Sequence, residues 1–218
     1  MSGKDDFLEP ASCSEVEFKE KRSLFVGRAL KASDESEARE LIREISKQHP
    51  DASHNCWAYR VGFPETVEYY SDAGEPSGTA GKPILGAILR SGVVNVVVIV
   101  TRYFGGTKLG VRGLIEAYGR CASMALEGAG TRLRVRSREA FVECPYEHAQ
   151  IVMRQMTELG IPENEIRPEW GSLVGFSASV PCSLAESAEN LFDGYRQRGF
   201  ILRWNWGKNW GAISDDVS

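Results

Sequence analysis

An apolar segment between two glycine-rich loops constrains the fold of this chain more than any other feature. Val93–Val100 has one polar residue, Asn95, and its β-branched side chains favour a strand that is covered on both faces. Glycine, hydroxyl and charged residues crowd the flanking loops, Asp72–Lys82 and Arg102–Gly110. Glycine lets the backbone approach a ligand closely, and loops on a rigid strand often carry function. The sequence therefore predicts a site at the two ends of one buried strand.

The length and composition indicate a globular protein. The 218 residues suffice for one large domain or two ordinary ones, and 42% are hydrophobic and 26% charged. The longest apolar run, Val96–Val100, is too short to cross a bilayer, and the polar N-terminus is not a secretory signal. We therefore expect a cytoplasmic protein without a membrane partner. The five cysteines are scattered without a Cys-x-x-Cys pair, so neither a disulfide framework nor a zinc site is indicated.

The net charge of −4 hides a basic segment in the middle of the chain. Residues 82–136 carry nine Lys and Arg side chains and two carboxylates, whereas residues 1–81 carry ten basic and sixteen acidic groups. A basic segment inside an acidic protein favours an anionic partner at that place. The alternative is that these cations pair with the acidic residues of the first 81.

The pattern of apolar residues and chain breakers predicts two domains of the α+β class. Over residues 14–136, predicted strands alternate with predicted helices. Over residues 138–210, the order βαββαβ predicts a ferredoxin-like domain with a hairpin that turns at Gly171-Ser172. Arg132–Arg138 is the predicted joint, and residues 1–13 are predicted to be a flexible tail.

The two loops are candidates for anion binding, although neither has a nucleotide-binding signature. Proline follows Gly81-Lys82 where a P-loop needs Ser or Thr, and residues 105–110 lack the Rossmann spacing, so no cofactor is indicated. The amides of Gly105 and Gly106 can turn outward, and a predicted helix with free N–H groups begins after Gly110. The candidate anion- or nucleic-acid-binding residues are Ser77, Thr79, Lys82, Arg102, Tyr103, Phe104, Gly105, Gly106, Lys108, Gly110 and Arg112. Alternatively, Gly105-Gly106 is only a tight turn from strand to helix.

Asp72, Glu75 and His54 are weaker candidates for catalysis. The two carboxylates lie three residues apart, which suits acid–base chemistry or magnesium, yet these residue types are also common in turns, so we assign no metal site. His54 and Cys56 share one face of a predicted strand, as a Cys–His nucleophile pair would. A half-buried histidine with satisfied hydrogen bonds is the simpler interpretation.

Two tryptophans near the C-terminus, Trp204 and Trp206, allow two interpretations. They can form a platform for base stacking, or they can pack on the helices of the second domain, because they lie two apart on a predicted strand. Packing is the expected outcome.

Four stretches of the chain resemble the IMPACT/YigZ family. They are Ser53–Arg60, Ser71–Gly81, Val96–Val100 and Thr101–Gly110, and their order and gaps fit throughout. The resemblance implies a first domain of the two-layer α/β type found in a small-subunit ribosomal protein, elongation factor G and ribonuclease PH, with a left-handed βαβ crossover. It also implies a second domain like the last domain of elongation factor G, as in the bacterial YigZ-type members.

The resemblance and the basic segment together favour a non-enzymatic RNA- or ribosome-associated protein that regulates translation. Two alternatives remain open, because fold alone does not fix function. One is an enzyme that acts on a phosphorylated or carboxylated small molecule at the two loops, which a pocket around Asp72, Glu75 and Arg102 would favour. The other is a protein-interaction module, which an apolar patch on the second domain would favour.

Overall fold

The computed structural model describes residues 5–214 and divides the chain into two compact units. The N-terminal unit is Phe7–Arg132, and the C-terminal unit combines the chain from Leu133 onward with Asp5 and Asp6 from the start of the described chain. The division therefore falls at the start of the predicted joint, Arg132–Arg138. Both units combine helices with a sheet, which confirms the two-domain α+β class.

The N-terminal unit is built on a five-stranded antiparallel sheet with the strand order β2-β3-β6-β4-β5. Its strands are β2 (Ser14–Glu20), β3 (Ser23–Lys31), β4 (His54–Val61), β5 (Val67–Ser71) and β6 (Val96–Tyr103). The central strand β6 is the predicted covered strand, shifted towards the C-terminus because Asn95, with a φ of 57°, interrupts the apolar segment before it. Arg102 and Tyr103, expected in the second loop, are therefore strand residues.

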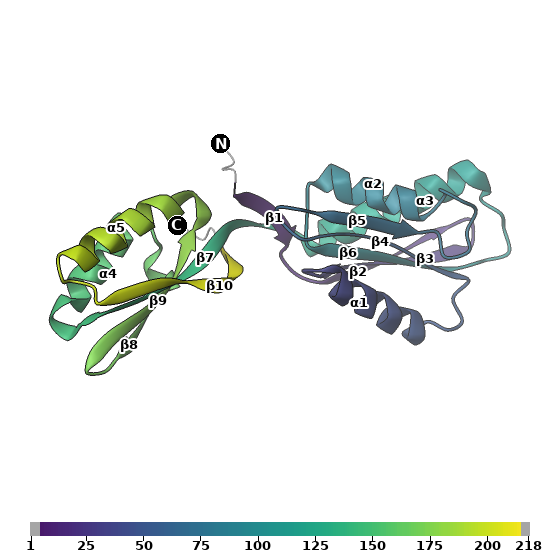
Figure 1. The fold of residues 1–218 in the computed structure, drawn as a ribbon. Coiled ribbons are helices and arrows are strands. Elements are labelled where there is room, and N and C mark those ends of the chain that lie inside the picture. Colours follow the sequence, from purple (N-terminus) through teal and green to yellow (C-terminus); the bar gives the residue numbers. More distant parts are fainter. Residues whose placement is uncertain (1–4, 215–218) are drawn as a thin grey trace. The chain divides into compact units, whose positions relative to one another are not determined.

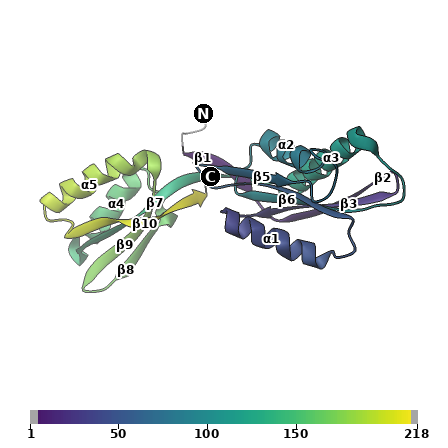
Figure 2. The ribbon, with the colours of Figure 1, turned by 45° about the vertical axis from the view of Figure 1, so that its right-hand side comes forward.

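Helices cover both faces of this sheet (Figures 1 and 2). Helices α2 (Gly81–Ser91) and α3 (Gly110–Ala129) pack on the face of Val98 and Val100, and α1 (Glu35–Gln48) packs on the opposite face. The unit therefore has three layers, with the sheet between α1 and the helix pair, whereas the family resemblance implied two layers. The physical reason is that β6 is apolar on both faces, since Val96–Val100 is 0% exposed throughout.

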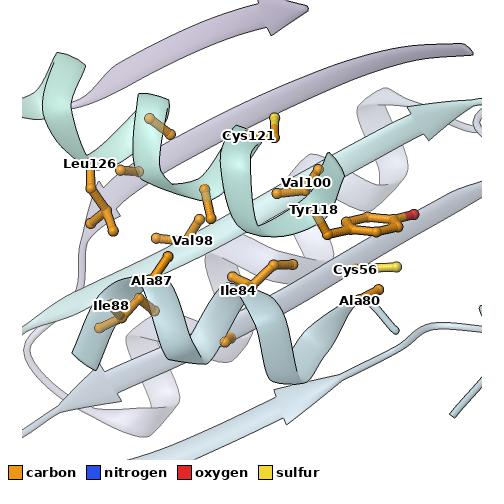
Figure 3. Close-up of a cluster of buried hydrophobic side chains, with 14 of the residues drawn as sticks. Cys56, Ala80, Ile84, Ala87, Ile88, Val98, Val100, Tyr118, Cys121 and Leu126 are labelled. Atoms are coloured by element: carbon orange, nitrogen blue, oxygen red, sulfur yellow. The ribbon is translucent and has the colours of Figure 1, made fainter. Parts of the chain in front are cut away.

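The main core of the N-terminal unit lies between β6 and the helix pair α2 and α3 (Figure 3). Ile84 and Ile88 reach it from α2, and Tyr118 and Leu126 reach it from α3. Helix α3 approaches the sheet closely at Gly27, where a Cβ atom would lie only 2.7 Å from Cys121 Sγ.

The C-terminal unit has the predicted βαββαβ order. Its elements are β7 (Thr131–Pro145), α4 (Ala149–Glu158), β8 (Ile166–Trp170), β9 (Leu173–Pro181), α5 (Ala185–Gln197) and β10 (Arg203–Ser214). Antiparallel pairs join β8 to β9, β9 to β7 and β7 to β10, which is the ferredoxin-like arrangement. The helices pack on one face of this sheet through residues such as Val142, Phe176 and Phe192.

Two tryptophans of β10, Trp204 and Trp206, belong to this helix-covered face. Trp204 and Trp206 pack against the core, and their indole N–H groups donate hydrogen bonds to Asp193 and Glu189 at 2.9 and 2.7 Å. The packing interpretation is thereby confirmed, and the rings do not form a free stacking platform.

Part of the predicted tail is ordered. Residues 1–4 lie outside the described residues, but Asp6–Pro10 forms strand β1, so the prediction of a flexible tail was wrong there. Glu9 is only 2% exposed, and its carboxylate pairs with Lys31 at 3.2 Å and Arg132 at 2.7 Å. Such a polar segment looks unstructured in sequence because the cations that compensate its buried charge lie far along the chain. No helix in the described part of the chain is long and apolar enough to span a membrane.

Candidate functional site

A buried ion pair joins the two glycine loops. Arg102 lies on β6 between Phe25 of β3 and His54 of β4 in the strand register. Its guanidinium, 6% exposed, donates from Nη1 to Glu75 Oε1 at 2.6 Å, and the Tyr118 hydroxyl of α3 donates to the same oxygen at 2.8 Å. Arg102 lies two residues after Val100 on β6, so its side chain is on the same face of the sheet as α2 and α3. There Glu75 rather than an external phosphate neutralises its charge.

His54 is held beside this pair. Its Nδ1 lies 2.9 Å from the carbonyl oxygen of Ala73, and since a carbonyl only accepts hydrogen bonds, Nδ1 carries a proton. Nε2 then faces Glu75 Oε1 at 3.9 Å, which is too long for a hydrogen bond. The histidine thus stands at the edge of the buried cluster without a hydrogen bond to the carboxylate.

Asp72 organises the first loop from its N-terminal end. Its Oδ1 accepts the backbone N–H groups of Ala80 and Gly81 at 2.9 Å, and its Oδ2 accepts that of Gly78 at 2.8 Å. The carboxylate therefore caps α2. Burial alone would raise the pKa of Asp72, but these hydrogen bonds outweigh it and hold the pKa below 3.8. The amides that an external anion would use here are thus occupied by the loop's own side chain.

Replacing Asp72 by asparagine should lower the free energy of unfolding at pH 7 by about 1 to 2 kcal/mol, as expected for the loss of a charged helix cap. The folded-state pKa is lowered, so the contribution of Asp72 is complete above 3.8 and is lost as the pH falls through the folded pKa. Urea unfolding at several pH values between 7 and 2 should therefore show that the free energy of unfolding falls less with acid in Asp72→Asn than in the wild type. The control is Asp51→Asn, which removes an exposed carboxylate. Identical pH profiles of stability for Asp72→Asn and the wild type would contradict the role of Asp72 as the cap of α2.

Cys56 does not have the properties of a nucleophile. Burial raises the pKa of its thiol to about 12, and Sγ donates to the carbonyl oxygen of Asp72 at 2.9 Å. A thiol with this pKa is protonated at neutral pH and unreactive. The simpler interpretation of the His54 and Cys56 pattern, as structural side chains of one strand face, fits this geometry.

The structure separates the predicted anion-binding residues into internal and exposed groups. The internal ones are engaged within the unit: Thr79 donates to the Pro76 carbonyl, Arg102 pairs with Glu75, the Tyr103 hydroxyl lies 2.7 Å from His49 Nδ1, and the Gly105 amide donates to Ser23. The exposed ones are Ser77, Lys82, Phe104, Gly106, Lys108, Gly110 and Arg112. The side chains that remain available to a ligand thus lie mostly in the second loop and the start of α3.

The polar cluster does not surround a described cavity. Asp72, Glu75 and Arg102 converge on backbone and on one another, whereas depressions of about 480 to 520 Å³ lie elsewhere. They lie on the open sheet face of the C-terminal unit, between the β2–β3 turn and α3, and between α2 and α3. Among residues 5–214, no group of three or more His, Cys, Asp and Glu side chains is placed to hold a metal ion.

Exposed cations gather around the second of these depressions. Lys21 and Arg120 line it, and exposed Arg22, Lys108 and Arg112 directly adjoin the lining residues along the chain. We call these five residues the basic surface. Arg112 pairs with Glu116 at 2.8 Å, but the described carboxylates make no ion pair with Lys21, Lys108 or Arg120. The surface therefore keeps an excess of positive charge that is open to solvent.

Lys21 and Arg22 contribute to this surface, although the sequence pattern did not single them out. They are the two central residues of the β2–β3 turn, with φ values of 43° and 70°. The second loop touches this turn, because a Cβ atom on Gly105 would lie 1.9 Å from the Arg22 carbonyl oxygen. The sequence signal that could have identified them is a pair of cations in a two-residue hairpin turn, a position where Asn-Gly is the preferred pair.

Comparison with known proteins gives a consistent family assignment. Residues 21–126 match the Impact N-terminal domain. The chain is 40% identical over 146 residues to IMPACT family member YvyE of Bacillus subtilis, which covers 67% of this chain and 63% of that protein. It is 35% identical over 144 residues to IMPACT family member YigZ of Escherichia coli, covering 65% and 71% of the two chains. A crystal structure of a hypothetical protein matches 98% of this chain and 99% of its own, with a TM-score of 0.64 and 26% identity. This chain therefore belongs to the IMPACT family.

Proposed function

We propose that this protein is a non-enzymatic RNA- or ribosome-associated factor that regulates translation and contacts phosphates through the basic surface. The observation that carries the proposal is the group of exposed cations around the β2–β3 turn and the start of α3. Cations without a carboxylate partner bind phosphates without first breaking an ion pair, and phosphate contacts dominate binding to nucleic acids. The translational role is supported by the family resemblance.

An exposed aromatic ring adjoins these cations along the second loop. Phe104 is 47% exposed, and the guanidinium of the buried Arg102 lies 5.4 Å from its ring centroid. Exposed rings next to cations stack on unpaired bases in proteins that bind single-stranded nucleic acids. In this proposal Arg102 supports the ring and the strand end, and the exposed cations make the phosphate contacts.

The test is fluorescence anisotropy of labelled RNA over a series of salt concentrations. The double variant Lys108→Ala/Arg120→Ala should bind more weakly, and the slope of log affinity against log salt should become shallower by about 1.4 to 1.8, as expected for two lost phosphate contacts. The matched control is Arg43→Ala/Lys47→Ala, which removes two exposed cations from α1 on the opposite face of the sheet. Equal affinities for both variants and the wild type would refute the basic surface as the RNA contact.

A further inference from the structure

We infer that the depression beside the basic surface holds one unpaired nucleotide and gives the protein a preference for single-stranded over double-stranded RNA. The inference rests on the proposed function, because it names the form of RNA that the basic surface takes. The depression has a volume of about 480 Å³, within the range of sites that hold small molecules. It is lined by Phe18, Glu20, Lys21, Leu109, Gly113, Glu116, Ala117 and Arg120.

The wall formed by β2 offers an aromatic ring for stacking. Phe25, which is fully buried, stacks on the Phe18 ring with 5.2 Å between centroids. The guanidinium of Arg120 lies 5.4 Å from the centroid of Phe18, and this arginine side chain is exposed. A base can replace the guanidinium on the Phe18 ring while Arg120 pairs with the phosphate of the same nucleotide.

The charges around the depression suit a nucleotide better than a bare phosphate. Lys21 and Arg120 provide cations, and Glu20 and Glu116 place carboxylate oxygens on the same lining. Carboxylates accept hydrogen bonds from the amino and imino groups of bases, and they repel phosphates. In a duplex those groups are engaged in base pairing, whereas in a single strand they are free. The mixture of charges therefore selects an unpaired base with its phosphate at the cationic side.

The experiment compares the affinities of one labelled RNA as a single strand and as a duplex. The wild type should bind the single strand about 5-fold to 150-fold more tightly, the range that corresponds to stacking of one base at about 1 to 3 kcal/mol. Phe18→Leu removes the ring, and Gly113→Leu fills the depression without changing a charge; both should abolish most of this preference while keeping the salt dependence. Phe141→Leu, which removes a 40% exposed ring from the C-terminal unit, is the matched control and should keep the preference.

The outcomes separate this inference from the proposed function. Equal binding of single strand and duplex, or a preference that survives in both Phe18→Leu and Gly113→Leu, overturns the nucleotide site and leaves RNA binding through the basic surface intact. Absence of binding to either RNA at low salt overturns both. Should Phe18→Leu fail to fold, Gly113→Leu decides, because Gly113 is in the first turns of α3 and the three atoms nearest to an added Cβ all belong to the Leu109 side chain, the closest at 3.1 Å.

Discussion

Replacing Arg102 by methionine will lower the free energy of unfolding by about 3 to 5 kcal/mol, the range expected when one partner of a buried ion pair is removed. The guanidinium and the Glu75 carboxylate are only 6% and 4% exposed, and methionine leaves that carboxylate without its cation. Urea unfolding of the variant at pH 7 measures the effect. A loss below about 1 kcal/mol would mean that water reaches Glu75 and that the pair is not buried in solution.

A double-mutant cycle isolates the interaction between these two groups. Glu75→Gln should also be strongly destabilising, and the combined variant Glu75→Gln/Arg102→Met should lose less than the sum of the single losses, because neither charge is then left alone. The matched control is the pair Arg112 and Glu116, which has almost the same separation, 2.8 Å, but side chains that are 93% and 64% exposed. Removal of either partner there should change stability far less. Similar effects in the two cycles would contradict burial as the cause.

Replacing Gly105 by alanine will destabilise the N-terminal unit by about 3 kcal/mol or more, as severe overpacking does. The new Cβ would lie 1.9 Å from the carbonyl oxygen and 2.2 Å from the carbonyl carbon of Arg22, and backbone atoms cannot turn aside as a flexible side chain can. Thermal unfolding followed by circular dichroism measures the loss.

The neighbouring glycine provides the control for this prediction. Gly106 has a φ of 87°, and a Cβ atom added to it would meet nothing within 4 Å beyond its own chain neighbours. Gly106→Ala should therefore cost only the conformational strain of about 1 to 2 kcal/mol. If the two alanine variants melt at the same temperature, then Gly105 is not required by the close contact between the second loop and the β2–β3 turn.

Local patterns were enough to predict much of the fold. The apolar residues of β6, the hairpin at Gly171-Ser172 and the βαββαβ order all depend on short-range periodicity and turn chemistry, and they are present in the structure. Strand β1 was not predictable in this way, because burial of Glu9 depends on Lys31 and Arg132. Short edge strand β5 was missed for a related reason: its side chains are largely exposed and give no apolar signal.

The sequence singled out the two loops, but it did not predict which of their charged residues pair inside the fold. Glycine and charge density pointed to the two loops, and these do meet in space. The pairing of Glu75 with Arg102, 27 residues apart, depends on the register of β6 against its neighbours and on the position of α3. A sequence shows that a charge is present, whereas only packing shows whether it faces a partner inside the fold or solvent. That difference is why the phosphate contacts are proposed for Lys21, Lys108 and Arg120 rather than for Arg102.

The β2–β3 turn has a consequence for efforts to engineer this protein. Both central residues have positive φ, a conformation that disfavours side chains such as Lys21 and Arg22 by about 1 to 2 kcal/mol each and that Asn-Gly adopts readily. A redesign aimed only at thermal stability would choose Asn-Gly and obtain a firmer hairpin. It would also delete two charges from the basic surface, for which we propose the RNA contact. If the proposed surface contacts RNA, stability and RNA affinity are opposing objectives at this turn, and the more stable variant should bind RNA more weakly.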